Sequence, residues 1–291
     1  MDIILVATVI LAPFLTRLLC RWLGLVKPNF RGQRIPAALG LTFVMIAAVH
    51  EALLVVPRCF PPVLPPCPSG LLCDDDLSDF YFGASRPIRS LGVLLAFGLL
   101  GFIDDRWGNR SVGGFRGHLK SLFSGKPTTG GLKLIGGGIA ALWFVWPMNA
   151  EVLFHPEIRE WWKFPIGAGL IALGANTINL LDLRPGRALF GFAVLMLPSL
   201  RVVTSLWPLL LGVLIEWPFD IRAKGMLGDT GSNLLGALVG IAAVRALPLW
   251  GQALLLALLL ALNLAAERVS ITATIAKTPW LRTLDRWLGV R

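Results

Sequence analysis

Nine apolar segments recur along the whole length of this 291-residue chain. Most run for about 15 to 20 residues, close to the ~20 that an α-helix needs to cross a hydrocarbon core about 30 Å thick. The sixth and seventh are shorter, and little more than Pro248 separates the last two. The sequence therefore predicts an all-α, polytopic transmembrane bundle of about nine helices, forming a single integral membrane domain over residues 1–291. The segments are residues 2–19, 37–56, 88–103, 131–149, 164–181, 187–200, 205–219, 230–247 and 249–266.

Composition excludes an ordinary soluble domain of this length. The chain is 55% hydrophobic and only 15% charged, and its mean hydropathy is +0.71. A soluble chain of this size carries more charged residues, about a quarter of the total. The formal charge of +10 is spread over short loops, where each basic residue near anionic lipid contributes ~1 kcal/mol. We therefore expect a membrane partner and no nucleic acid partner.

Basic residues predict the orientation of the bundle. With the N-terminus outside and every segment crossing, 20 of the 27 Lys and Arg residues fall on the inner side. This bias follows the positive-inside rule and predicts a multi-pass protein of the plasma (inner) membrane with a cytoplasmic C-terminus. The same topology predicts an outer loop at 57–87, a cytoplasmic loop at 104–130 and a cytoplasmic tail at 267–291. The tail alternates apolar and charged residues, as does an amphipathic helix at a membrane surface.

Acidic residues mark several of the predicted cytoplasmic helix ends. Asp104 and Asp105 follow the third segment, Asp182 follows the fifth, and Asp229 precedes the eighth. Ionisable groups at membrane depth are costly, so their presence there calls for a reason. Gathered into one cleft, such carboxylates would suit Mg²⁺ and a phosphorylated substrate, with Mn²⁺ as a second possible cation. The alternative for any single Asp is a solvated surface group or a helix cap.

The stretch "GDTGSN", residues 228–233, directly precedes the eighth segment. Polar side chains at the start of a helix can cap its free N–H groups, and Gly228 would let the backbone approach a ligand closely. A helix N-terminus also attracts an anion such as a diphosphate. Gly228, Thr230 and Ser232 are therefore candidate substrate contacts beside Asp229, and the alternative is a capped turn without a ligand.

The stretch "NTINLLD" places Asn176, Asn179 and Asp182 three residues apart. On a helix this spacing puts their side chains along one face, near the cytoplasmic end of an otherwise apolar segment. The two amides would then form part of a polar site in the bundle interior. The alternative is that they only join neighbouring helices through hydrogen bonds.

Five motifs, in order along about residues 27–240, carry a resemblance to a known family: "KPNFRGQRIPAALGL", "LLGFIDDRWGNR", "GGLKLIGGG", "NTINLLD" and "KGMLGDTGSN". Together they resemble the polyprenyl-phosphate glycosyl-1-phosphate transferases, which include phospho-N-acetylmuramoyl-pentapeptide transferase and the GlcNAc-1-phosphate transferases. The resemblance implies Mg²⁺-dependent transfer of a sugar 1-phosphate from a nucleotide sugar, normally a UDP-sugar, to polyprenyl phosphate in cell-envelope glycan synthesis. It also implies a homodimer.

The resemblance implies a role for each matching residue. Asp104 and Asp105 correspond to paired aspartates, one of which deprotonates the lipid phosphate, and Asp229 corresponds to the metal ligand. Asn179 and Asp182 form a polar pair, and Lys133 neutralises phosphate, with a membrane-edge anchor as its alternative. Either direct attack by the lipid phosphate or a covalent Asp intermediate is compatible with these residues.

Two departures from the family pattern affect the expected donor. After the fifth segment the chain reads "DLRPGRALF", without the second Asp and the glycines of the loop associated with the nucleobase. The tail contains no histidine, so the His-rich loop of the family has no counterpart. Arg184 and Arg187 are candidate phosphate contacts, because Arg offers a planar fork of donors. Their alternative role is that of membrane-edge charges.

Three classes of function follow from these patterns. The first is the transferase. The second is a membrane protein derived from the same family, with altered or lost donor use, that acts as a lipid-binding or assembly partner. The third is a transporter, but transport carboxylates belong near the bilayer midplane in interrupted helices. The aspartates here are predicted at one face, which favours the first two classes.

Overall fold

The computed structural model describes residues 2–29, 31–59, 73–108, 128–146 and 163–289, together with a few residues between 117 and 125. The described chain is mostly helical and contains eleven α-helices, one 3₁₀ helix and one two-stranded hairpin. The elements are α1 (Asp2–Trp22), β1 (Val26–Pro28), β2 (Arg34–Pro36), α2 (Leu41–Cys59), α3 (Cys73–Trp107), α5 (Thr129–Val145), α7 (Lys163–Leu181), α8 (Arg187–Met196), η1 (Leu197–Val202), α9 (Val203–Ile221), α10 (Gly228–Ala246), α11 (Leu249–Arg268), α12 (Ile271–Lys277) and α13 (Pro279–Leu288).

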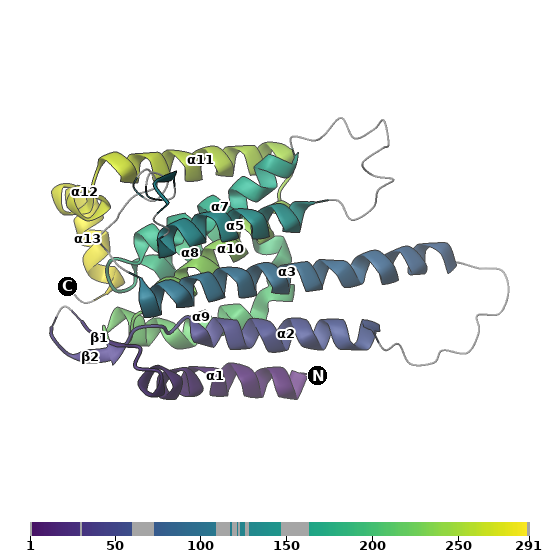
Figure 1. Ribbon diagram of the computed structural model, residues 1–291, viewed down its shortest axis with the longest axis horizontal. Coiled ribbons are helices and arrows are strands. Elements are labelled where there is room, and N and C mark those ends of the chain that lie inside the picture. The colour runs from purple at the N-terminus through teal and green to yellow at the C-terminus, as the bar shows by residue number, and fades with distance from the viewer. Residues whose placement is uncertain are drawn as a thin grey trace.

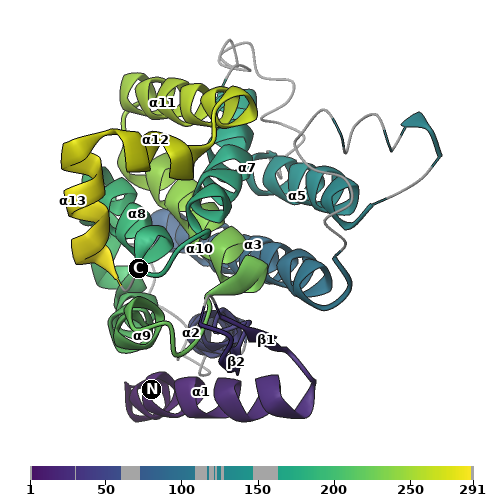
Figure 2. The same ribbon diagram turned by 90° about the vertical axis from the view of Figure 1, so that its left-hand side faces the viewer.

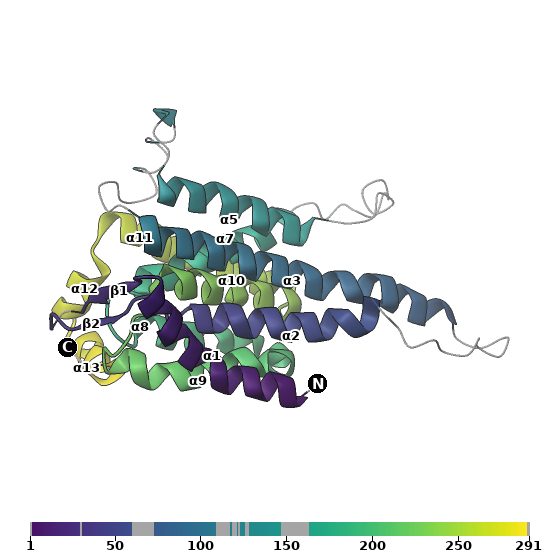
Figure 3. The ribbon, with the colours of Figure 1, turned by 60° about the horizontal axis from the view of Figure 1, so that its bottom comes forward.

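The longer helices lie roughly side by side and form a bundle (Figure 1). The hairpin, α12, α13 and the C-terminus gather at one end of this bundle, which we call the hairpin end. Seen from the hairpin end, α10 lies in the middle of the bundle, with α3, α7, α8 and α9 around it (Figure 2). Helix α3 extends beyond α2 and α10 at the opposite end (Figure 3).

Small residues allow α10 to occupy the centre. Almost all of its residues from Gly228 to Ala243 are buried. At Gly236, an added Cβ would lie 2.3 Å from the carbonyl oxygen of Gly174 in α7, so only glycine permits this approach of the two backbones. Such small-residue contacts are the usual way for apolar helices to pack closely. The glycine spacing of α10 thus determines how near the surrounding helices stand to it.

A buried polar cluster joins α1, α2 and α9. Arg17 donates a hydrogen bond of 2.7 Å to Glu216, and Thr42 donates one of 2.7 Å to the other oxygen of the same carboxylate. Glu216 and Thr42 are fully buried. Because both oxygens of Glu216 are paired, the carboxylate is stabilised away from water, and it fixes these three helices to one another.

Large apolar side chains are exposed on the outside of the bundle. They include Ile10 and Phe14 of α1 and Leu254 and Leu258 of α11. By length and composition, three helices of the described chain could cross a membrane: Ile3–Trp22, Lys163–Leu181 and Leu249–Arg268. An apolar outer face is what a bilayer would cover, because lipid tails solvate such side chains as well as a protein core does.

Each of the nine predicted apolar segments overlaps a helix, and the sixth is completed by η1; residues 147–149 of the fourth segment lie outside the described residues. The helical class is therefore confirmed, whereas the number of crossings and the orientation of the termini stay predictions. The antiparallel hairpin, which pairs Val26 with Pro36 and Pro28 with Arg34, was not predicted. The hairpin is short because its prolines lack the N–H group needed to extend a ladder.

The predicted loop boundaries need correction. Helix α3 begins at Cys73, so residues 73–87 of the predicted outer loop are helical, and only 60–72 lie outside the described residues. The prolines of that loop are concentrated before Cys73, and none follows until Pro87. At its other end α3 continues to Trp107, so Asp104 and Asp105 belong to the last turns of a helix and not to the loop predicted at 104–130. The tail predicted at 267–291 contains α12 and α13.

Candidate functional site

A cavity of about 440 Å³ opens among α3, α5, α7 and α10 near the hairpin end. Eight of the residues predicted from the sequence line it: Asp104, Asp105, Lys133, Asn176, Asn179, Asp182, Gly228 and Asp229. Most of its other lining residues are apolar or small, and include Phe97, Leu100, Leu134, Gly137, Gly138, Ala172, Leu173 and Ala175. The fold thus brings carboxylates from three separate parts of the chain into one cavity that also has apolar walls.

Lys133 of α5 lies between two carboxylates. Its Nζ is 3.0 Å from Oδ2 of Asp104 and also donates a hydrogen bond to Oδ2 of Asp229. With its amide oriented to suit both partners, Asn179 donates to Oδ1 of Asp229 at 3.2 Å and accepts from Lys133 at 3.2 Å. Asp104, Asp229 and Asn179 therefore converge on one cationic group.

The pKa values of Asp104 and Asp229 shift in opposite directions. Both residues lie at helix ends, just beyond the apolar segments 88–103 and 230–247. Burial and the neighbouring Asp104 raise the pKa of Asp229 to about 7, against the charge of Lys133. Although burial opposes it, the hydrogen bond to Asp229 and the charge of Lys133 lower the pKa of Asp104. Asp104 is therefore the more acidic of the two carboxylates, and Asp229 is the weaker acid.

Asp105 is adjacent to Asp104, but it hydrogen-bonds to the start of α10 instead of to Lys133. Its Oδ1 accepts a hydrogen bond of 3.0 Å from the Asp229 backbone, and its Oδ2 accepts from the backbone and the hydroxyl of Thr230 at 2.9 and 2.7 Å. Leu227 precedes α10 and provides no side-chain cap. Asp105 of α3 therefore caps α10 from another helix, and these two N–H groups are not available to a diphosphate.

Gly228 has a backbone role at this junction. Its φ of +72° lies in the left-handed region, and an added Cβ would lie 2.4 Å from the Ala37 carbonyl oxygen and 2.7 Å from Oδ2 of Asp105. Any other residue would be strained here and would push Asp105 away. Gly228 was predicted as a substrate contact; the structure shows that it also shapes the start of α10.

Asp182 follows α7 and connects the main cavity to a second one of about 100 Å³. Burial, and then the charges of Asp220, Asp229 and Asp105, raise the pKa of Asp182 well above its usual range. Arg184 lines the second cavity and not the first. A group bound between the two cavities would thus contact Asp182 and come near Arg184.

Three predicted substrate contacts lie elsewhere. Thr230 and Ser232 are fully buried behind the cavity, where Thr230 bonds to Asp105 and the Ser232 hydroxyl lies 3.5 Å from the amide of Asn179. Arg187 is not among the residues that line either cavity. Its guanidinium donates two hydrogen bonds to Asp285 of α13, at 2.5 and 2.9 Å, because α8 begins after Gly186 and directs this side chain toward the tail.

Four polar residues that line the cavity were not selected from the sequence: Lys27, Thr129, Asn233 and Glu267. Lys27 lies in the first of the five motifs, and Asn233 ends "GDTGSN". Glu267 is an acidic residue at the end of a long apolar helix, and this position by itself indicates a candidate site residue. The position of each residue depends on how the hairpin, α5, α10 and α11 pack.

The donor atoms suit Mg²⁺ only in part. Among the described residues, no group of three or more His, Cys, Asp or Glu side chains is placed to hold a metal ion. Two carboxylates and an amide do converge, and Mg²⁺ commonly takes one or two carboxylates and completes its shell with water and substrate phosphate oxygens. Asp104, Asp229 and Asn179 are paired with Lys133, so they would hold a Mg²⁺ or Mn²⁺ ion only together with a phosphorylated substrate that takes over part of the contacts with Lys133.

Fold and cavity together define a class: a mostly helical protein with apolar helices able to cross a membrane, and a carboxylate-lined cavity at one end of the bundle. A scan against models of known protein families finds none that matches this chain, and a search of curated proteins also finds no match.

Proposed function

We propose that this protein is a membrane-bound glycosyl-1-phosphate transferase that moves a sugar 1-phosphate from a nucleotide sugar, with UDP as the favoured nucleotide, to polyprenyl phosphate. The product is a polyprenyl diphosphate-linked sugar for cell-envelope glycan synthesis. The observation that carries the proposal is the cavity itself, in which charged groups for phosphate chemistry and apolar walls for a lipid chain adjoin. The resemblance of the five motifs supports it.

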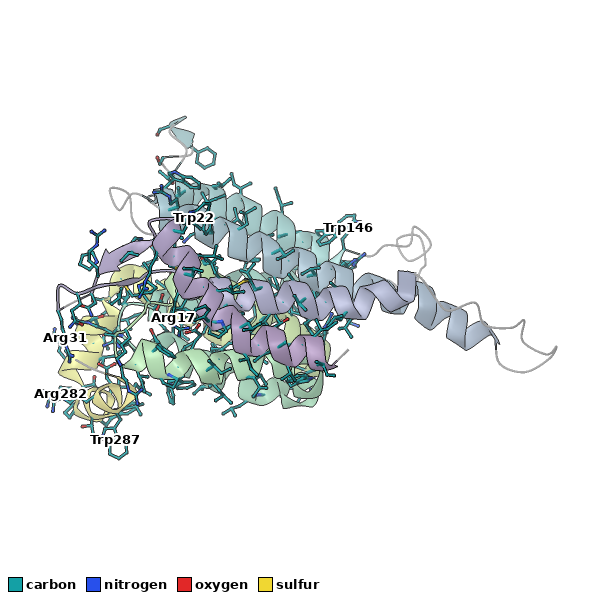
Figure 4. The ribbon with its side chains drawn as sticks, turned by 90° about the horizontal axis from the view of Figure 1, so that it is seen from below. Arg17, Trp22, Arg31, Trp146, Arg282 and Trp287 are labelled. Atoms are coloured by element: carbon teal, nitrogen blue, oxygen red, sulfur yellow. The ribbon has the colours of Figure 1, made fainter. Side chains whose placement is uncertain are left out.

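The arrangement of aromatic and basic residues supports a membrane location with the cavity toward the cytoplasm. Trp22 and Trp287 lie at the hairpin end together with Arg31 and Arg282, whereas Trp146 lies at the opposite end (Figure 4). Tryptophan prefers both membrane interfaces, and Arg prefers the cytoplasmic one. We therefore place the hairpin end in the cytoplasm of a multi-pass inner-membrane protein.

The walls of the cavity suit an amphiphile. Along α3, Phe97, Leu100 and Asp104 follow one face, so that the wall changes from apolar to charged within two turns. On α5, Lys133 is followed by Gly137, against which the Phe97 ring packs, and by Gly138, where an added Cβ would meet nothing within 4 Å. A phosphate group at the charged end would place its isoprenoid chain against the apolar side chains, where burial of each CH₂ contributes about 0.8 kcal/mol.

The reaction requires that an oxygen of the lipid phosphate attack the sugar-linked phosphorus of the donor. A new P–O bond forms, the P–O bond to the nucleoside monophosphate breaks, and that group leaves. The lowered pKa of Asp104 makes this carboxylate a weak base, so the attacking oxygen is one that the lipid phosphate already presents in deprotonated form, while Lys133 and Asn179 position the phosphoryl oxygens. A Mg²⁺ ion held by Asp229 and Asp104 would neutralise diphosphate charge, which is the main requirement of phosphoryl transfer.

The competing function is a lipid-binding or assembly partner without turnover. The altered sequence around Arg184 and the missing His-rich loop favour it, because both would weaken donor recognition. The geometry favours chemistry, since Lys133 balances the two like charges that a passive lipid site would not need to hold together. The homodimer implied by the resemblance stays a prediction.

Purified protein incubated with polyprenyl phosphate, Mg²⁺ and a panel of nucleotide sugars tests the proposal through release of a nucleoside monophosphate. We expect release with one donor, its loss on chelation by EDTA, and its loss in Asp229→Asn at unchanged thermal stability. Asp285→Asn, a carboxylate change outside the cavity, should retain turnover per folded molecule. Absence of release with every donor, despite lipid binding, would support the partner function instead.

A further inference from the structure

The side-chain amide nitrogen of Asn233 is buried and has no partner among the described residues. Asn233 lies in α10, lines the main cavity and is 5% exposed. Its Nδ2 has no hydrogen-bond partner within the part of the chain that the structure describes. Buried amide donors are nearly always paired, because an unpaired donor loses its hydrogen bonds to water on folding and gains none within the protein.

Another buried amide in the same bundle shows the ordinary situation. Asn263 of α11 donates to Thr177 at 2.8 Å and to the Leu259 carbonyl at 2.7 Å, and its oxygen accepts from Asn176. Its role is fully explained by helix packing. The Nδ2 of Asn233 makes no comparable contact within the described ranges, although the residue lies at a cavity wall, so this donor is available to a bound molecule.

The position of Asn233 indicates which bound molecule would accept a hydrogen bond from its amide. It follows Asp229 by four residues and therefore lies on the same face of α10, about 6 Å further along the helix axis. That direction leads from the hairpin end into the bundle, where Phe97, Leu100 and Ala175 line the same cavity. A water-soluble nucleotide sugar meets the charged end first, whereas the apolar part beside Asn233 suits the lipid substrate.

We propose that Nδ2 of Asn233 donates a hydrogen bond to an oxygen of the phosphate group of polyprenyl phosphate and thereby sets the depth at which this substrate binds. This inference rests on the proposed function. A neutral amide suits the task, since it stabilises a phosphate oxygen without adding a charge to an apolar wall. The carboxylates and Lys133 are then left for the donor diphosphate and the reacting oxygen.

Binding of polyprenyl phosphate and of the matching polyprenol, which lacks the phosphate, to the purified full-length protein tests the inference. Asn233→Leu keeps the side-chain volume and removes the donor. We expect it to weaken polyprenyl phosphate binding about tenfold, the usual effect of losing a hydrogen bond to a charged group, and to leave polyprenol binding unchanged. Asn233→Ser, which keeps a donor on a shorter side chain, should bind with intermediate affinity.

A matched control is Thr42→Val, which removes a buried hydroxyl that is paired with Thr16 and Glu216 and is not among the residues that line the cavity. This control should lower thermal stability and leave lipid affinity unchanged, whereas Asn233→Leu should not lower thermal stability. The inference would be overturned if Asn233→Leu bound polyprenyl phosphate as tightly as the wild type does, or if it lost as much affinity for polyprenol. It would also be overturned if the thermal stability of Asn233→Leu fell as much as that of the control. A wild-type protein that binds neither lipid would instead overturn the proposed function.

Discussion

The carboxylate of Asp105 in α3 caps α10 by accepting hydrogen bonds from both the backbone and the hydroxyl of Thr230. The two residues are 125 positions apart. The contact fixes α10, and with it Asp229, against the helix that carries Asp104. Both adjacent aspartates line the cavity, but Asp105 positions α10 whereas Asp104 pairs with Lys133.

Removal of this cap should destabilise the protein without removing a reacting group. We expect Asp105→Ala to lower the free energy of unfolding by about 1–2 kcal/mol, the usual cost of losing a helix cap. Thr230→Val should have a smaller effect, because the backbone N–H contacts remain. Thermal unfolding in detergent of the single and double variants would measure this, and fully additive losses would show that the two residues do not act together.

The ammonium group of Lys133 pairs with the carboxylates of both Asp104 and Asp229, so the loss of Lys133 should affect turnover more than folding. Lys133→Met leaves two carboxylates without their shared cation, and we expect turnover to fall by about 10²–10³. Lys133→Arg retains the charge and should retain part of the activity. The measurement is nucleoside monophosphate release at saturating substrates; equal activity of the Met and Arg variants would contradict a role for the charge.

Asp182 should lower stability at neutral pH. Its folded-state pKa is raised above the ordinary 3.8, because burial and the nearby Asp220 disfavour the charged form. The penalty of ionisation is absent below the unfolded-state pKa, grows as pH rises through the interval between the two values, and is complete above the folded-state pKa. Asp182→Asn should therefore raise the melting temperature by roughly a few degrees at pH 7 and by less near pH 4.

Arg187 was predicted as a phosphate contact, and its pairing with Asp285 predicts a structural role instead. Arg187→Met should destabilise the protein by about 3–5 kcal/mol, because it removes the cation that pairs with the buried carboxylate of Asp285 through two hydrogen bonds. The double variant Arg187→Met with Asp285→Leu should recover most of that loss. Urea or thermal unfolding measures the cycle, and a variant that stays stable but loses lipid or nucleotide affinity would restore the original assignment.

Several features of the site could be anticipated from local sequence. The apolar segments predicted the helices, and Asp104, Asn179 and Asp229 could be placed near their ends because helical spacing and segment boundaries are local properties. The hairpin that brings Lys27 to the cavity could not be anticipated in this way, since two three-residue strands carry almost no periodic signal. Glu267 could likewise be recognised from the sequence as an acidic residue at a helix end, but its proximity to the cavity could not be predicted.

The sequence by itself determined that the chain forms apolar helices with polar residues at their ends, since hydrophobicity and 3.6-residue periodicity act within single segments. Only the tertiary structure decided which of those polar residues meet. Adjacent residues on a helix point about 100° apart, so Asp104 turns toward Lys133 while Asp105 turns toward Thr230. That choice depends on how closely α3, α5 and α10 pack, which is a property of the assembled bundle.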